Sequence, residues 1–125
     1  MDHIALINEQ LTEKIIGICF EVLNELGSGF LESVYQRAVA ITLLQAGLKV
    51  QEQVPLKVSF RGRVVGEFYA DVVVEDQVVL EMKSVKSLAA EHEAQLLNYL
   101  KATGMKVGLL LNFNRSKFEW KRLVY

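Results

Sequence analysis

The sequence has little of several things, and each shortage excludes a class of protein. It has one cysteine, Cys19, which excludes an internal disulfide and makes the reducing cytoplasm the expected compartment. No run of ~18 uncharged apolar residues occurs, so we expect no membrane span. Residues 1–10 lack the basic start and apolar stretch of a signal peptide. With one proline and no low-complexity tract, the 125 residues are expected to form a single domain, 1–125.

The excess of charge is also small, because the net charge is −1. Such a value argues against a strongly basic nucleic-acid-binding protein. The distribution is uneven: residues 1–30 hold five acids and one base, whereas residues 101–125 hold six bases and one acid. A basic end could meet a phosphate backbone. Two ordinary solvated faces explain the same charges, and charge alone favours that interpretation.

Apolar residues recur at helical spacing in three segments. The first runs from about Asn8 to Gly27, where glycine accepts the left-handed backbone that ends a helix. Cys19 lies within its apolar stripe and is expected in the core. The second segment covers 31–46, and the third covers 90–102, with Ser87 before it as a cap.

Strand patterns fill much of the rest. Residues 48–85 alternate or cluster with β-branched enrichment and predict three strands joined by tight turns at 61–62 and 75–77. The runs 107–111 and 118–124 predict a buried strand and a strand near an edge. We therefore expect an α/β (α+β) fold, a central mixed sheet of about four to five strands flanked by helices. The strand after the third helix should run parallel to the third strand through a right-handed crossover.

The strands on either side of the turn at 75–77 carry three charged residues among valines. Glu81 and Lys83 point the same way, because side chains on a strand alternate between faces. A three-residue turn places Asp71 directly opposite Glu81, whereas a two-residue turn would place it with the apolar side chains. The hydrophobic pattern selects the three-residue turn, and that register brings together two acids and a lysine.

Such a cluster needs a reason, because charged groups cost free energy to bury. Two adjacent carboxylates repel each other, and a hard divalent cation bound by their oxygens removes that repulsion. A lysine beside them can offset the charge of a phosphate or orient a water. A cross-strand salt bridge near the end of the sheet is the alternative, and the pattern leaves the two interpretations about even.

Two helical features add to this cluster. His92, Gln95 and Tyr99 form one polar stripe on the third helix, which either faces a site or is the solvated side of the helix. Glu32 lies one turn before Tyr35 on the second helix, where an acid also complements the helix dipole.

Read together, these residues resemble the PD-(D/E)XK nuclease superfamily and, within it, the GxxExxY family. Ala70 stands where the superfamily's name has proline, a position that varies widely among its members. The likeness extends from the first helix to residues 112–114. The matching residues are Gly29, Glu32 and Tyr35 for the naming motif, Asp71 followed by Glu81, Met82 and Lys83 for the acidic and acid-x-Lys elements, and Gln95 and Tyr99 for the Gln-x-x-x-Tyr motif of RecB-type nucleases.

The resemblance implies a restriction-endonuclease-like core and a metal-dependent nuclease. Its reaction would be hydrolysis of phosphodiester bonds in DNA or RNA by a metal-activated water. Mg²⁺ or Mn²⁺ would be bound by Asp71 and Glu81 with the backbone carbonyl of Met82, and by Glu32 directly or through a water. These four residues are the implied metal ligands.

The resemblance also implies supporting roles. Lys83 would position the attacking water or stabilise the charged transition state, and Gln95 would orient the site or contact the substrate. Tyr99 would support that arrangement together with Tyr35, and His92 is a weaker neighbour.

Two other functions stay open. A catalytically silent module with the same fold would bind nucleic acid or a protein partner, which the near-zero net charge motivates. An accessory subunit or homodimer would use an exposed strand face as its interface. Arg61 and Arg63 at the turn could touch phosphate, although exposed arginines are common in turns. Trp120 beside Lys121 could stack on bases, but a strand with one apolar and one solvated face is the preferred interpretation.

Overall fold

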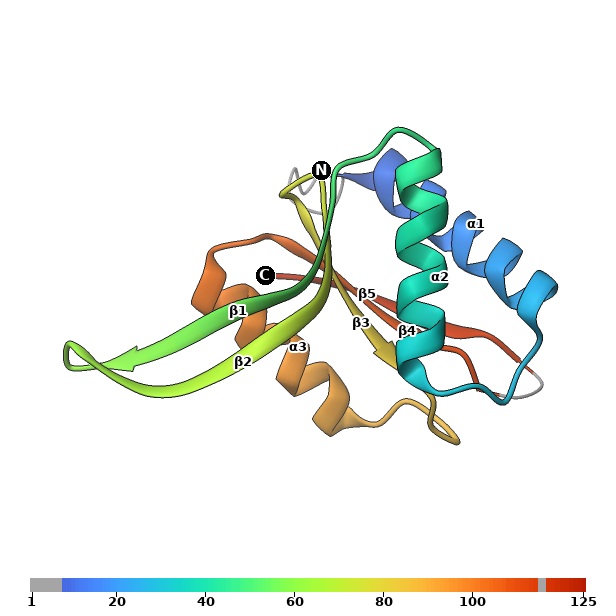
Figure 1. The fold of residues 1–125 in the computed structure, drawn as a ribbon. Helices are drawn as coiled ribbons and strands as arrows, with labels where there is room; N and C mark the ends of the chain where they lie inside the picture. Colours follow the sequence, from blue (N-terminus) through green and yellow to red (C-terminus); the bar gives the residue numbers. More distant parts are fainter. Residues whose placement is uncertain (1–7, 115–116) are drawn as a thin grey trace.

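The computed structural model describes residues 8–114 and 117–125. Within these ranges no helix is both long and apolar enough to cross a membrane. The elements follow one another in the predicted order (Figure 1). They are α1 (Glu9–Leu26), α2 (Glu32–Gln45), β1 (Val50–Phe60), β2 (Arg63–Val74), β3 (Val78–Lys83), α3 (Ala90–Thr103), β4 (Val107–Asn112) and β5 (Glu119–Val124).

The five strands form one mixed sheet in the spatial order β1-β2-β3-β4-β5. Neighbouring strands are antiparallel except β3 and β4, which are parallel and are connected through α3. The predicted mixed sheet flanked by helices is confirmed, as is the place of the last strand at an edge. In this topology the carboxyl end of β3 leads directly into the loop before α3.

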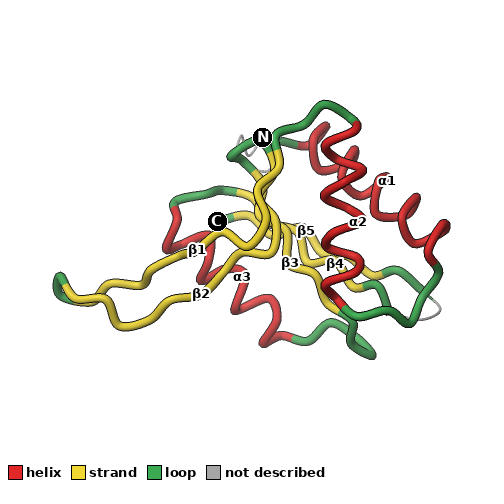
Figure 2. The backbone as a smooth tube through the Cα atoms, in the orientation of Figure 1, coloured by secondary structure: helices red, strands yellow, loops and turns green. Residues whose placement is uncertain are grey.

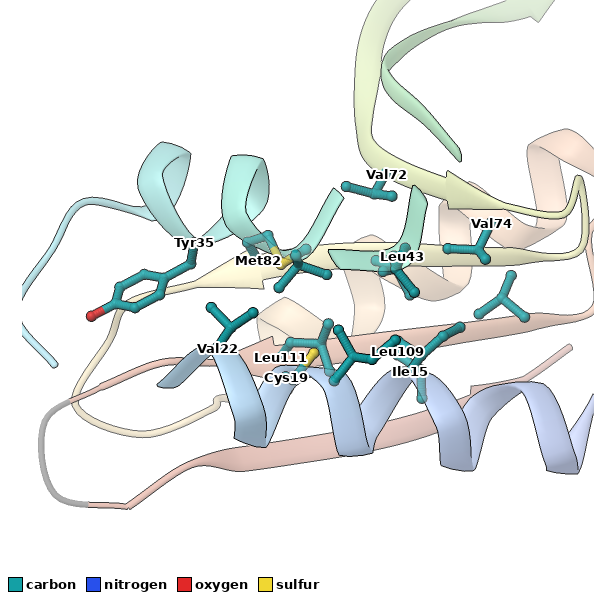
Figure 3. Packing of buried hydrophobic residues seen from close by; sticks show 14 of the residues in the cluster. Ile15, Cys19, Val22, Tyr35, Leu43, Val72, Val74, Met82, Leu109 and Leu111 are labelled. Carbon is teal, nitrogen blue, oxygen red and sulfur yellow. The ribbon is translucent and has the colours of Figure 1, made fainter. Parts of the chain in front are cut away.

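The sheet carries a different apolar cluster on each face. On one face, α1 and α2 pack on even-numbered residues of β2 and β3 and odd-numbered residues of β4 (Figure 3). Cys19 is fully buried there, as predicted. On the other face, α3 contributes Leu96, Tyr99 and Leu100 to a smaller cluster. One strand can therefore support a large core on one side and a helix-bordered site on the other.

The helix ends agree with the sequence in part. Gly27 ends α1 with φ 77°, and its N–H donates to the carbonyl of Leu23. Asn8 precedes α1, but its side chain makes no capping bond. The prediction that Ser87 caps α3 is wrong: Ala89 holds that place, and its N–H donates to His92 Nδ1 at 2.9 Å. A histidine in the first turn thus replaces the expected hydroxyl cap.

β1 and β2 pair with each other over a greater length than β2 pairs with β3. β1 pairs with β2 from Val50↔Val74 to Phe60↔Arg63, whereas β2 pairs with β3 over residues 72–74 alone. The two strands therefore continue as a two-stranded ribbon away from the rest of the sheet, which is visible as the green arm in Figure 1 and as the pair of long yellow strands labelled β1 and β2 in Figure 2.

Candidate active site

The turn between β2 and β3 has the three-residue length that the hydrophobic pattern selected. Val74 pairs with Val78 and Val72 pairs with Leu80. Glu75 and Asp76 take left-handed backbone conformations with φ near 54° and 55°, which lets the chain reverse over residues 75–77. The predicted register is confirmed, and it directs Asp71 and Glu81 toward each other.

Asp71 lies where β2 separates from β3. The pairing of β2 with β3 stops at Val72↔Leu80. Beyond that pair, the Asp71 carboxylate replaces a backbone carbonyl as the hydrogen-bond acceptor, and Met82 N–H donates to Asp71 Oδ2 at 2.8 Å. The other oxygen, Oδ1, accepts a hydrogen bond from Gln53 Nε2 at 3.3 Å. Both oxygens are thus oriented by partners on the neighbouring strands, Gln53 on β1 and Met82 on β3. These contacts fix the carboxylate at the point where β2 and β3 separate.

Glu81 is the most electrostatically perturbed acid of the site. Its Oε1 is buried and has no hydrogen-bond partner among the described residues. Burial is the main cause that raises the pKa of Glu81 to about 8, the nearby charge of Asp71 adds to it, and Lys83 opposes it. A buried carboxylate with an unpartnered oxygen beside a second carboxylate has the electrostatics of a cation site.

Lys83 borders an open cleft of about 520 Å³ at the carboxyl end of β3. Across the cleft lies the first half of α3, which contributes Gln95 and His92. Lys83 forms no ion pair with any residue that the structure describes, and Gln95 is exposed. The cleft therefore presents an ammonium and an amide to whatever enters it. The complete lining is Lys83, Glu91, His92, Ala94, Gln95 and Asn98.

Tyr99 lies behind this cleft, on the inner side of α3. The residue is buried, and its ring packs edge-on against Phe68 with centroids 4.0 Å apart. Burial raises the pKa of its hydroxyl, and the charges of Glu81 and Asp71 raise it further. Tyr99 is therefore a neutral hydroxyl within electrostatic range of both acids, and its supporting role stays a prediction.

Glu32 approaches from the opposite side, in the first turn of α2. Its Oε1 accepts a hydrogen bond from Ser84 N–H at 3.1 Å, just past the end of β3. The side chain is exposed and lines a second open hollow with Ser84 and residues 29–33. Glu32 thus binds Ser84, which lies two residues beyond Met82, just past the end of the strand that carries Glu81 and Lys83.

Tyr35 explains the spacing of the motif that contains Glu32. It is fully buried, and its hydroxyl donates to Gly27 O at 2.7 Å and accepts from Phe30 N–H at 3.3 Å. Its ring stacks on Phe113 with centroids 4.6 Å apart. These contacts fix the loop that leads into α2, in which Gly29 has φ 102°. Tyr35 lies in the core, where it holds the backbone that places Glu32.

Two other predicted residues have structural tasks. His92 accepts the N–H of Ala89 and so begins α3, although one edge of it reaches the cleft. The Met82 side chain is 1% exposed in the main core, and its N–H orients Asp71. The carbonyl of Met82 as a metal ligand stays a prediction.

Sequence reasoning missed a chain of amides that supports Asp71. Gln53 has φ 49°, a rare value for a residue with a side chain, and interrupts the pairing of β1 between Glu52 and Val54. Its Nε2 also donates to Gln36 Oε1 at 2.8 Å, and Gln36 in turn donates to Glu52 Oε1 at 3.3 Å. No pattern in the sequence marks a glutamine of one strand as the partner of an acid on the next.

The buried Asn112 was also missed. Its amide donates to Val85 O and its Oδ1 accepts Val85 N–H, at 2.9 and 3.0 Å. The same amide donates to Glu119 Oε1 at 3.0 Å. Asn112 thereby fixes the start of the loop after Lys83.

The arrangement fits a partly open site for a divalent cation rather than a closed cage. Among residues 8–114 and 117–125, no three His, Cys, Asp or Glu side chains converge closely enough to form a ready-made metal site. Mg²⁺ characteristically uses one or two carboxylates and completes its shell with waters and substrate phosphates. Asp71 and the unpartnered oxygen of Glu81 provide such a pair.

Comparison with known proteins gives matches of two kinds, to a family model and to solved structures. A family model described as the PD-(D/E)XK nuclease superfamily matches residues 9–123. A solved structure, "Crystal structure of SSO0001", superposes with a TM-score of 0.58 at 14% sequence identity. The match covers 94% of this chain but 59% of the other chain, and at that identity it supports the fold alone. A search of the curated proteins found no match.

Proposed function

Because this chain belongs to the PD-(D/E)XK nuclease superfamily, we propose that it hydrolyses phosphodiester bonds of DNA or RNA in a reaction that depends on Mg²⁺ or Mn²⁺. The observation that carries the proposal is the meeting of Asp71 with Glu81 at the gap between β2 and β3. The unpartnered oxygen of Glu81 and the raised pKa of that group indicate that a bound cation would stabilise the two adjacent carboxylates.

In this proposal each residue of the site has a separate role. Asp71 and Glu81 hold the cation, and Glu32 completes its surroundings from α2, directly or through a water. Lys83, which faces the open cleft, orients the attacking water or stabilises the negative charge that develops on the phosphoryl oxygens. Gln95 contacts the substrate backbone across the cleft, and Tyr99 supports the two acids from behind.

A divalent cation supplies two effects when bound: it lowers the pKa of water and offsets charge on a phosphoryl group. The protein contributes position. Met82 N–H and Gln53 fix the two oxygens of Asp71, so that this carboxylate needs little rearrangement on binding.

We also propose membership of the GxxExxY group. The support is the link between the motif's members: Tyr35 fixes the loop that contains Gly29, and that loop places Glu32 at Ser84 N–H. The spacing thus connects the buried Tyr35 to an acid at the end of β3.

The test is cleavage of labelled single- and double-stranded DNA and RNA by the pure protein, with Mg²⁺, with Mn²⁺ and with a chelator. Lys83→Ala should cleave at least ~100-fold more slowly, because it removes the charge stabilisation at the reacting phosphate. Lys14→Ala, on the exposed side of α1, is the matched control and should cleave normally. Absence of metal-dependent cleavage, or equal rates for Lys83→Ala and wild type, contradicts the proposal.

The alternative is a silent nuclease-fold module that binds nucleic acid or a protein partner. The absence of a three-ligand acidic group among the described residues favours it. Titration calorimetry with Mg²⁺ and Mn²⁺ separates the two functions, since a folded protein that binds neither metal is the expected behaviour of the module.

A further inference from the structure

The far part of the β1–β2 hairpin, residues 57–67, projects from the molecule, and no other element of residues 8–114 and 117–125 covers it. We name this segment the outer hairpin. Figures 1 and 2 show it as an arm that extends past the ends of the other strands. Its residues are exposed apart from the half-buried Val58 and Gly66. Val64 and Val65, at which the pairing with β1 is irregular, are 58% and 63% exposed. An uncovered ribbon of this length has a surface that the fold itself does not use.

Charge separates the outer hairpin from the rest of the chain. It holds three bases and one acid, a net charge of +2, which leaves −3 for the remainder of a chain whose total is −1. Its bases are Lys57, Arg61 and Arg63, all exposed, and none forms an ion pair with a residue that the structure describes. The basic arm thus projects from an acidic body.

The tip combines a cation with an aromatic ring. Arg61 lies over the ring of Phe60 at 5.0 Å from its centroid, and Phe60 is 59% exposed. Arg61 and Gly62 have φ 49° and 76°, a two-residue hairpin turn whose geometry keeps the ends of both strands together. An arginine held on a ring presents its guanidinium plane outward, where it can bind phosphate or stack on a base.

The outer hairpin is continuous with the candidate active site, because β2 carries both. Asp71 is eight residues from Arg63 along this strand, and at a rise of ~3.3 Å per residue the two are separated by about 26 Å. Successive phosphates of one strand of a duplex advance by ~3.4 Å along the helix axis, so this length corresponds to about seven or eight base pairs. A nucleic acid whose cleaved phosphate lies at Asp71 can reach the tip if it extends that far.

We infer that the outer hairpin is a substrate-binding arm that contacts the phosphate backbone of nucleic acid about seven or eight base pairs from the point of cleavage. This inference rests on the proposed function for its substrate. It assigns to Arg61 and Arg63 positive charge for the substrate on a chain whose remainder has a net charge of −3, and it predicts that binding depends on substrate length.

The experiment measures fluorescence anisotropy of labelled DNA duplexes of about six and about 24 base pairs, in a chelator so that cleavage cannot interfere. The test variant is Arg61→Asn with Arg63→Thr. Asn-Gly is a preferred pair for this type of turn and threonine favours strands, so the hairpin keeps its shape while it loses two charges. We expect at least a tenfold loss of affinity for the long duplex, a salt slope reduced by about two, and little change for the short duplex.

Two controls make the result specific. Arg61→Lys with Arg63→Lys retains the charges and should retain most of the affinity for the long duplex. Lys14→Ser with Lys101→Ser removes the same charge from exposed positions on α1 and α3 and should change binding little. Equal weakening by this control, equal weakening of both duplexes, or unchanged binding by the test variant overturns the inference.

Light scattering on the same samples tests the competing use of this surface. If wild type is a dimer and Arg61→Asn with Arg63→Thr converts it to a monomer, the outer hairpin is an interface between copies and the inference fails. Failure of the proposed function looks different: the length-dependent loss of binding is then observed, but no metal supports cleavage of any nucleic acid by wild type.

Discussion

The two faces of β3 carry side chains of different kinds. Val78, Leu80 and Met82 point to one face and are at most 1% exposed within the core built with α1 and α2. On the other face Val79 is buried, but Glu81 and Lys83 follow it toward the open end of the strand. One strand thus serves as a packed support on one side and as a charged site on the other.

This difference shows how a small domain can keep two acids close together. A close-packed core resists displacement, so the backbone of β3 is fixed by the apolar side and the charged side chains inherit its position. Substitutions on the two faces should therefore have separable effects: one face should determine stability, and the other should determine chemistry. Each prediction below tests that separation.

The largest effect is expected at Glu81. Glu81→Gln removes an oxygen anion that the proposed cation needs, and cleavage should fall by ~1,000-fold or more, which corresponds to about 4 kcal/mol of activation free energy. The free energy of unfolding at pH 8 should not fall, because the variant no longer buries a carboxylate beside Asp71. Initial rates and urea denaturation measure the two quantities. Glu13→Gln, exposed on α1, is the matched control.

Leu80 should show the opposite behaviour. Leu80→Ala creates a cavity at a fully buried position and should lower the free energy of unfolding by about 2–5 kcal/mol. Cleavage per folded molecule should stay within a few-fold of wild type at a temperature where the variant is folded. A loss of cleavage without a loss of stability would contradict the proposed separation of the two faces.

The stability of the protein should also depend on pH because of Glu81, which lies on the charged face of β3. The pKa of Glu81 is about 8 in the folded protein, above its ordinary value of 4.5, so the folded state holds a proton that the unfolded state releases. The contribution of this group to stability is therefore fully present below pH ~4.5 and is lost as the pH rises to ~8. Without metal, the free energy of unfolding should decrease across this window by an amount on the order of a few kcal/mol.

Glu81→Gln supplies the control for that titration. The difference between its stability and that of wild type should grow as the pH rises from 4.5 to 8, since the glutamine does not titrate. Affinity for Mn²⁺ should rise over the same window in wild type, because proton and cation compete for one carboxylate. A constant difference between the two proteins would show that Glu81 titrates normally.

The sequence was sufficient to predict the element order, the parallel return of β4 and the register of β2 against β3. The register followed because a shift by one residue would have exchanged the apolar and charged sets of side chains between faces. The three-residue turn at 75–77 was selected by that pattern rather than by its own residues, and the structure has it. Strong periodicity thus fixed both the fold and the placing of Asp71 relative to Glu81.

The immediate surroundings of Asp71 could not be predicted. They depend on where β2 stops pairing with β3, because that point frees Met82 N–H for the carboxylate. They depend also on the left-handed backbone at Gln53, which brings an amide of β1 to the same acid. Both are consequences of strand separation in three dimensions, and a one-dimensional pattern of apolar residues carries no trace of them.

The smallest expected effect concerns this amide. Gln53→Gly removes the side chain that binds Asp71 Oδ1, while glycine accepts φ 49° without strain. Affinity for Mn²⁺ should fall by about 10- to 100-fold, because groups that orient a metal ligand commonly contribute that much. The free energy of unfolding should change by about 1 kcal/mol or less, since strain relief offsets the greater freedom of the unfolded chain.

Gln36→Ala supplies the matched comparison, because it removes the next amide of the chain and leaves the contact between Gln53 and Asp71 in place. Its effect on Mn²⁺ affinity should be smaller than that of Gln53→Gly. In the double variant the two losses should not add, since without Gln53 the amide of Gln36 has no route to Asp71. Additive losses would mean that Gln36 acts on the site independently of Gln53. An unchanged affinity in Gln53→Gly would mean that the strand pair alone positions Asp71 and that the apolar face of β3 is its sole support.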